Sequence, residues 1–269
     1  MSDWPHGPES RTCSGVGPQQ VGDSRDRADA ATMTPSENAI AVAKNRASGL
    51  LERLERALAA GEIDEEGWYR EVAAVITPPY LAGDDPRRQS GHSGDEAHWT
   101  QARSLIVDAI HRDGAFLDIG CANGYLMECV QRWARQRGWA IEPYGLDIAP
   151  ELADLARRRL PRWADRIFDG NALHWPPPRR FEFVRTGLEY VPRRRQRDLV
   201  QRLLRDVVSP GGRLIIGAYN EEKPPPSGEP PVESLVAAWG LPIAGRTERP
   251  HYHDPRLVYR AFWIDAPPA

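Results

Sequence analysis

The sequence has almost no lysine. Lys44 and Lys223 are the only two, so arginine supplies 33 of the 35 basic residues. Such a bias is typical of a GC-rich genome, so the Arg193-Arg194-Arg195 run is a weak indicator of phosphate binding and fits the start of an exposed helix. The formal net charge of -3 also argues against a protein that grips nucleic acid through charge alone. We therefore expect no nucleic-acid partner.

Long apolar runs are missing as well. No stretch reaches the ~18–20 consecutive apolar residues that a bilayer-spanning helix needs, so a membrane-spanning protein is excluded. Residues 1–20 are polar and rich in Gly and Pro, and they lack the apolar core of a secretory leader. The three cysteines are too few for a disulfide framework and suit a reducing compartment. These observations favour a cytoplasmic location.

The chain of 269 residues is long enough for one domain of roughly 170–200 residues with an extension. Residues 1–34 interleave Gly, Pro, Ser and charge, which predicts a disordered tail. Residues 35–96 predict a helical cap and linker. Within it, a leucine stripe comes first, a second helix over 68–76 ends at Thr77-Pro78-Pro79, and a loop covers 81–94.

Residues 97–269 alternate between strand and helix patterns. The pattern predicts helices over 97–111, 124–138, 150–160, 194–208 and 231–240, with short apolar strands before, between and after them. Such alternation predicts an α/β fold, a doubly wound and mostly parallel sheet with helices on both faces. The last two strands, near 243–247 and 257–264, are joined by too few residues for a crossover helix, so they should pair antiparallel.

The turn after the first strand of this region is the first candidate site. In such sheets, ligands bind outside the carboxyl ends of the strands. Gly120 and Gly124 let the backbone turn sharply and approach a ligand, and the next helix points free N–H groups at the same place. The spacing is G-x-x-x-G and not the G-x-G-x-x-G of a dinucleotide site, because Ala122 and Tyr125 stand where further glycines would be needed.

Two acidic segments follow at the expected places. Asp147 ends the second strand, where a carboxylate can accept hydrogen bonds from both ribose hydroxyls of a nucleoside. Asp169-Gly170-Asn171-Ala172 ends the third strand, where a carboxylate or amide can meet the amine of adenine. Each also has a purely structural interpretation. Asp147 could cap the next helix, and Asp169-Gly170 could form an ordinary tight turn.

Five segments in order resemble the motifs of class I S-adenosylmethionine-dependent methyltransferases. They are Phe116 to Gly124, Gly145-Leu146-Asp147-Ile148, Asp169 to Ala172, Phe181 to Pro192, and Ser209-Pro210-Gly211-Gly212. The resemblance implies a Rossmann-like sheet of seven strands whose last strand is antiparallel, with S-adenosyl-L-methionine as cofactor.

The resemblance also implies roles for residues of this sequence. The methionine part of the cofactor would be surrounded by residues of the glycine turn, namely Asp118, Gly120, Cys121, Asn123 and Gly124. Asp147 would hold the ribose, and Ile148 would lie beside the adenine. The adenine ring would be contacted by Asp169, Gly170, Asn171 and Ala172. The segment after the fourth strand would pass beneath the methyl group, with Thr186, Gly187 and Leu188 at the cofactor.

The acceptor is the least defined part. Methyltransferases that act on exocyclic base amines carry an Asn/Asp-Pro-Pro-aromatic motif where this chain has Thr186-Gly187-Leu188-Glu189, and no Pro-Cys dipeptide of a cytosine C5 enzyme is present. A small-molecule acceptor is therefore expected. Candidate catalytic residues are those that should overhang the strand ends, namely Glu189, Tyr190, His251 and His253. His251 and His253 alternate like metal ligands, but no further Cys or His set supports a metal, and none is expected.

Two alternatives stay open at this point. An NAD-dependent oxidoreductase is disfavoured by the glycine spacing. A catalytically silent S-adenosylmethionine-binding module would share every cofactor motif and would differ only in the lack of turnover.

Overall fold

The computed structural model describes residues 49–218, 230–252 and 257–268. All of them belong to the unit formed by Pro35–Ala269. The predicted tail over 1–34 and the predicted start of the cap lie outside the described residues. In the described part of the chain, no helix is long and apolar enough to cross a membrane.

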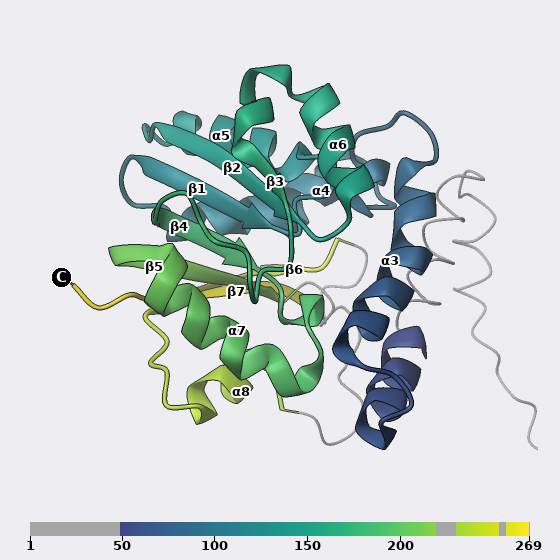
Figure 1. The fold of residues 1–269 in the computed structure, drawn as a ribbon. Helices are drawn as coiled ribbons and strands as arrows, with labels where there is room; N and C mark the ends of the chain where they lie inside the picture. The colour runs from purple at the N-terminus through teal and green to yellow at the C-terminus, as the bar shows by residue number, and fades with distance from the viewer. Residues whose placement is uncertain (1–48, 219–229, 253–256, 269) are drawn as a thin grey trace, which may run out of the picture. The chain divides into compact units, whose positions relative to one another are not determined.

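A seven-stranded sheet forms the centre of this unit, with strand order β3-β2-β1-β4-β5-β7-β6 (Figure 1). The strands are β1 Gly114–Ile119, β2 Ile141–Asp147, β3 Ile167–Asp169, β4 Phe181–Thr186, β5 Val208–Ala218, β6 Gly245–Pro250 and β7 Val258–Asp265. Strands β1 to β5 pair in parallel, and β7 runs antiparallel to both β5 and β6. The predicted doubly wound sheet with its antiparallel last strand is confirmed.

Helices cover both faces because the strands are apolar on both. They are α3 Glu65–Leu81, α4 Glu96–Arg103, α5 Tyr125–Gln136, α6 Pro150–Arg159, α7 Gln196–Arg202 and α8 Val232–Ala238. In β1, Leu117 and Ile119 belong to the cluster on the α7 and α8 face, whereas Phe116 belongs to the cluster formed with α4 and α5. This alternation follows from the two-residue period of a strand.

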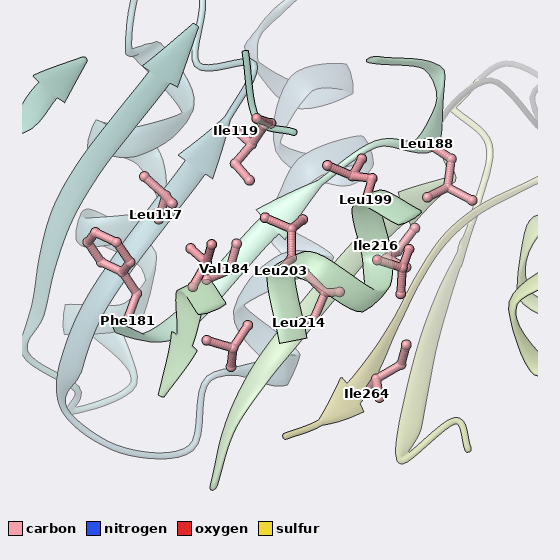
Figure 2. Packing of buried hydrophobic residues seen from close by; sticks show 14 of the residues in the cluster. Leu117, Ile119, Phe181, Val184, Leu188, Leu199, Leu203, Leu214, Ile216 and Ile264 are labelled. Carbon is pink, nitrogen blue, oxygen red and sulfur yellow. The ribbon is translucent and has the colours of Figure 1, made fainter. Parts of the chain in front are cut away.

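The core on the α7 face is built from β-branched and leucine side chains of neighbouring strands. Leu199 of α7 and Leu203, which begins the π-helical turn after α7, pack over Val184 of β4 and over Leu214 and Ile216 of β5 (Figure 2). Each of these side chains is almost completely buried. Burial of a side chain of this size contributes about 1.5–3 kcal/mol. This packing fixes the central strands, and with them the positions of the strand ends.

The helix expected to end before Pro78-Pro79 continues to Leu81, so the predicted boundary is wrong. Proline lacks the N–H that would bond to the preceding turn, but its fixed φ is compatible with a helix. The Ala82 N–H still donates to the Pro78 carbonyl at 3.1 Å. The extra turn is stabilised by tertiary packing, because the Tyr80 ring lies against Ala122, Ala149 and Leu152.

Two further boundaries differ from the sequence pattern. The helix expected over 97–111 divides into α4 and a 3-10 segment, Ser104–Ala109. The turn expected at 209–212 is incorporated into β5 as an irregularity, since Phe181 pairs with Val208 but Phe183 pairs with Arg213. Residues 49–60 are helical, as the leucine stripe predicts, and pack on α3 through Leu50, Leu54, Leu58 and Trp68.

Candidate functional site

The carboxyl ends of β1, β2, β3 and β4 meet at one edge of the sheet. Pairing in register places Asp118 opposite Arg185, and Asp147 opposite Asp169. The chain leaves β1 toward β2 on one side, and β4 lies on the other, so this edge is the point where the strand order reverses. Such points are where open α/β sheets bind ligands.

The turn between β1 and α5 has an unusual backbone. Gly120, Ala122 and Gly124 have φ values of 73°, 47° and 75°, all in the left-handed region. A Cβ atom placed on Gly120 would lie 2.8 Å from the Tyr190 ring, and one on Gly124 would lie 2.6 Å from Leu160 Cδ1. Glycine is therefore required at position 120 because the Tyr190 ring packs there, at the candidate site. At position 124 glycine is required because the turn packs against the end of α6.

Asp147 is hydrogen-bonded to this turn, and its burial makes the ionised form of the carboxyl group less favourable. Its Oδ2 accepts the Ala122 N–H at 2.8 Å, and its Oδ1 accepts the Ala149 N–H at 2.9 Å. Burial raises the pKa of Asp147 to about 6 despite these hydrogen bonds. Ile148, the next residue, is 40% exposed, which leaves an apolar surface beside the carboxylate.

Asp118 is the second buried carboxylate at the edge. Its Oδ1 accepts a hydrogen bond from Arg185 Nη1 at 3.1 Å, and the same nitrogen donates to the Ile119 carbonyl at 3.3 Å. Burial raises the pKa of Asp118 to about 6, although the Arg185 charge opposes this shift. Oδ2 of Asp118 has no hydrogen-bond partner in the described part of the chain.

The Asp169-to-Ala172 segment is joined to the end of β2. The Gly170 N–H donates to the Asp147 carbonyl at 2.8 Å, and Asn171 Oδ1 accepts the Leu173 N–H at 2.9 Å. Asp169 itself is exposed and pairs with Arg157 of α6 at 2.8 Å. Ala172 is buried in the core. The segment therefore lies beside Asp147 as expected, with its backbone and not the Asp169 carboxylate tied to that strand end.

The segment after β4 turns back across the end of β1. Glu189 folds against Gly187 just after β4, and the Tyr190 ring packs on Gly120, so Tyr190 is the predicted catalytic residue that reaches the glycine turn. Burial raises the pKa of both side chains. The Thr186 hydroxyl donates to the Gly187 carbonyl at 3.1 Å.

Two predicted cofactor residues point away from this edge. The Leu188 side chain belongs to the core on the α7 face. The Cys121 sulfur lies against Gly145 in a cluster with Met127 and α6, and burial raises its thiol pKa well above the usual value. Leu188 and Cys121 could therefore contact a ligand through their backbone atoms but not through their side chains.

Asn123 contacts the cap and linker segment. Its Oδ1 accepts hydrogen bonds from Ser90 Oγ at 2.6 Å and from the Tyr125 N–H at 3.1 Å, and its Nδ2 donates to the Pro86 carbonyl at 2.8 Å. The side chain is completely buried. The amide therefore fastens the loop before α4 to the glycine turn, a role that its sequence position did not indicate.

The end of the β6–β7 hairpin carries a group of aromatic rings at the same edge. β6 runs parallel to β5 and β7 antiparallel, so His251 follows β6 at the carboxyl edge, as predicted. The centre of the His251 ring lies 4.9 Å from the centre of the Tyr259 ring and 5.8 Å from that of the His98 ring, and His98 Nε2 is 2.6 Å from the Tyr259 hydroxyl.

His253 lies outside the described residues. Within the described ranges, no three His, Cys, Asp or Glu side chains are arranged to hold a metal ion.

Three residues of this edge were missed by sequence reasoning. Arg185 gave a signal, because a charged residue interrupts the otherwise apolar end of β4. Tyr80 and His98 gave none. Their positions depend on contacts with Ala149 and with Tyr259, which are far from them along the chain.

Comparison with known proteins agrees with this geometry. A family model described as a methyltransferase domain matches residues 116–212, which span the glycine turn and the ends of β1 to β4. No curated protein sequence is similar enough to count as a relative.

Two solved structures are similar to this chain. The 1,6-didemethyltoxoflavin-N1-methyltransferase of Burkholderia thailandensis, with bound 1,6-didemethyltoxoflavin and S-adenosylhomocysteine, is 17% identical; the match covers 76% of this chain and 91% of that one, with a TM-score of 0.56. The PH0226 protein of Pyrococcus horikoshii OT3 is 16% identical, over 70% and 95% of the two chains, with a TM-score of 0.48.

Residues 116–212 therefore resemble a methyltransferase domain, and the sheet of this chain has the fold of a solved methyltransferase.

Proposed function

We propose that this enzyme transfers the methyl group of S-adenosylmethionine to a small-molecule acceptor. The observation that carries the proposal is the position of α3 and the loop after it. They lie against the carboxyl ends of β1, β2 and β3, where the cofactor motifs are. A site covered in this way by its own chain favours a small acceptor over the surface of a protein or nucleic acid.

Three contacts establish this cover. Tyr69 of α3 packs against the core cluster that contains Ala172 and Leu173, which follow β3. Tyr80 packs on Ala149 after β2, and burial together with the nearby Asp147 charge raises its pKa to about 12. The loop over 86–90 is bonded to Asn123. The cover therefore reaches each of the three strand ends that the cofactor motifs occupy.

The charge of the chain supports the same acceptor class. The formal net charge is -3, and several arginines that could face a phosphate backbone are paired with carboxylates. Arg194 and Arg195, for example, pair with Glu65 of α3 at 3.1 and 3.2 Å. The predicted small-molecule acceptor and the predicted cytoplasmic location both stay predictions.

The cofactor residues follow from the strand ends. Asp147 would accept the ribose hydroxyls, and the exposed Ile148 would cover one face of the adenine. The backbone of Gly170 and Asn171 would meet the adenine edge. Asp118, Gly120 and the turn up to Gly124 would surround the amino-acid part. Bound there, S-adenosylmethionine supplies an activated methyl group.

The acceptor would then lie between the β4 end and the β6–β7 hairpin. Methyl transfer is a displacement in which the protein chiefly aligns the reactants and excludes water. Glu189, Tyr190 and His251 are the proposed catalytic residues, together with His253. A carboxylate whose pKa is raised by burial, as at Glu189, is a stronger base than a solvent-exposed carboxylate and is suited to take a proton from the acceptor.

Cofactor affinity is expected to depend on pH. Burial raises the pKa of both Asp118 and Asp147 to about 6, and both are proposed to bind hydrogen-bond donors in their charged forms. Binding below pH 6 must therefore release protons, and affinity should fall about tenfold per pH unit for each carboxylate involved. Above about pH 7 the affinity should be constant.

Calorimetry with S-adenosylhomocysteine in two buffers of different ionisation enthalpy counts the protons released at each pH. Equal affinity at about pH 5 and about pH 8, with no proton release, would contradict the assignment of these carboxylates.

The acceptor class is tested with S-adenosylmethionine that carries a labelled methyl group. The enzyme is incubated with it and a cell extract, and the extract is then separated into small molecules, protein and nucleic acid. We expect the label among the small molecules. Label recovered in protein or RNA would overturn the proposal, and unlabelled fractions without S-adenosylhomocysteine formation would count equally against it.

A further inference from the structure

A buried ion pair lies directly beneath the proposed amino-acid part of the cofactor. Arg185, the next-to-last residue of β4, is 4% exposed, and Asp118 of β1 is 1% exposed. Their strands pair in register at these two residues, so the pair bridges β1 and β4 immediately before the glycine turn. A buried ion pair is a poor device for stability, because desolvation of both charges offsets their attraction. The pair is therefore better explained by what it does for a ligand.

The two oxygens of Asp118 have different surroundings. Oδ1 is held by Arg185 Nη1, which also holds the Ile119 carbonyl that precedes Gly120. Oδ2 is buried and has no hydrogen-bond partner among the residues described. Such an atom costs free energy unless something donates to it. The centre of the Tyr190 ring lies 5.5 Å from Cζ of Arg185, and the same ring packs on Gly120.

We propose that Arg185 is a positioning residue for the cofactor. By holding Oδ1 of Asp118 and the Ile119 carbonyl, it leaves Oδ2 of Asp118 to accept the α-ammonium group of the cofactor's amino-acid part. The ammonium group fits this position because it is a cation with three N–H donors, and Oδ2 of the Asp118 carboxylate has no partner among the described residues. This inference rests on the proposed cofactor site.

The charge of Asp118 depends on groups from several elements. Among the described residues they include Arg185 from β4, Arg103 from α4 and Asp147 from β2, and the ionisable side chains of Tyr190 and Cys121 are coupled to it as well. Without Arg185, the carboxylate faces the Asp147 charge and keeps the more weakly interacting Arg103. The pKa of Asp118 should then rise further, and the carboxyl group should be protonated near neutral pH.

The test compares two ligands that differ only at the amino-acid part. S-adenosylhomocysteine carries the α-ammonium group, whereas 5′-methylthioadenosine keeps the adenine, ribose and sulfur but lacks it. In Arg185→Met, affinity for S-adenosylhomocysteine should fall about 10- to 100-fold, while affinity for 5′-methylthioadenosine should stay within about threefold. Arg185→Lys should keep most of the wild-type preference between the two ligands.

Asp118→Asn serves as the second variant, because it keeps an oxygen for Arg185 and removes the charge. It should show the same selective loss, and the double variant should lose no more than either single one, since both changes remove one interaction. The affinity of Arg185→Met for S-adenosylhomocysteine should also begin to fall at a higher pH than that of the wild type.

Equal loss of both ligands in Arg185→Met and Asp118→Asn would show a merely structural role and overturn the inference. So would unchanged affinity for S-adenosylhomocysteine in both variants. Failure of the proposed cofactor site is distinguishable, because the wild-type protein would then bind neither ligand.

Discussion

Asp147→Ala is expected to lower affinity for S-adenosylhomocysteine by about 10- to 150-fold, the range for loss of a charge-assisted hydrogen-bond pair. The carboxylate is buried at the end of β2, and it carries a pKa raised to about 6. Holding a carboxylate ionised there costs free energy that two ribose hydroxyls would offset by donating to it. Because 5′-methylthioadenosine has the same ribose, its affinity should fall equally.

The same substitution removes two acceptors of backbone N–H groups, those of Ala122 and Ala149. Some loss of thermal stability is therefore expected, and calorimetric titration has to be read together with a melting curve. Asp154→Ala is the matched control, because Asp154 is an exposed carboxylate on the neighbouring helix α6 that pairs with Arg157. Unchanged affinity for both ligands in a folded Asp147→Ala protein would show that the ribose binds elsewhere.

Much of this site could be predicted because its signals are local. A glycine turn after an apolar strand, and an acid at the end of the next strand, are read from a few adjacent residues. The sheet order then places them together without further information. The positions of Asp147, Gly120 and the end of the hairpin at His251 were predictable for this reason.

The parts that could not be predicted depend on contacts between distant segments. Asn123 stands in the turn motif, yet its side chain binds Ser90 of the linker, 33 residues earlier. Leu188 follows β4 at the site, yet it packs in the core because the chain turns into a 3-10 helix there. The helix that continues through Pro78 and Pro79 is a similar case, since packing of Tyr80 outweighs the local preference to end.

Gly120→Val should abolish cofactor binding. Gly120 has a φ of 73°, a conformation that is costly for any residue with a Cβ and most costly for a β-branched one. The new Cβ would lie 2.8 Å from the Tyr190 ring, so the ring must shift, and the valine methyl groups would occupy the space where cofactor and backbone meet. We expect no measurable binding of S-adenosylhomocysteine at concentrations that saturate the wild type.

Backbone strain has to be separated from this loss, and the chain offers a matched control. Gly138 has a φ of 87°, and no atom lies within 4 Å of a Cβ placed there. Gly138→Val should therefore lower the melting temperature through the same kind of strain and leave binding unchanged. Adding Tyr190→Ala to Gly120→Val relieves the clash with the ring, but the valine still blocks the approach of the amino-acid part, so binding should not return. Recovery of wild-type affinity in that double variant would mean that Gly120 serves only the packing of Tyr190, and that the cofactor does not approach this turn.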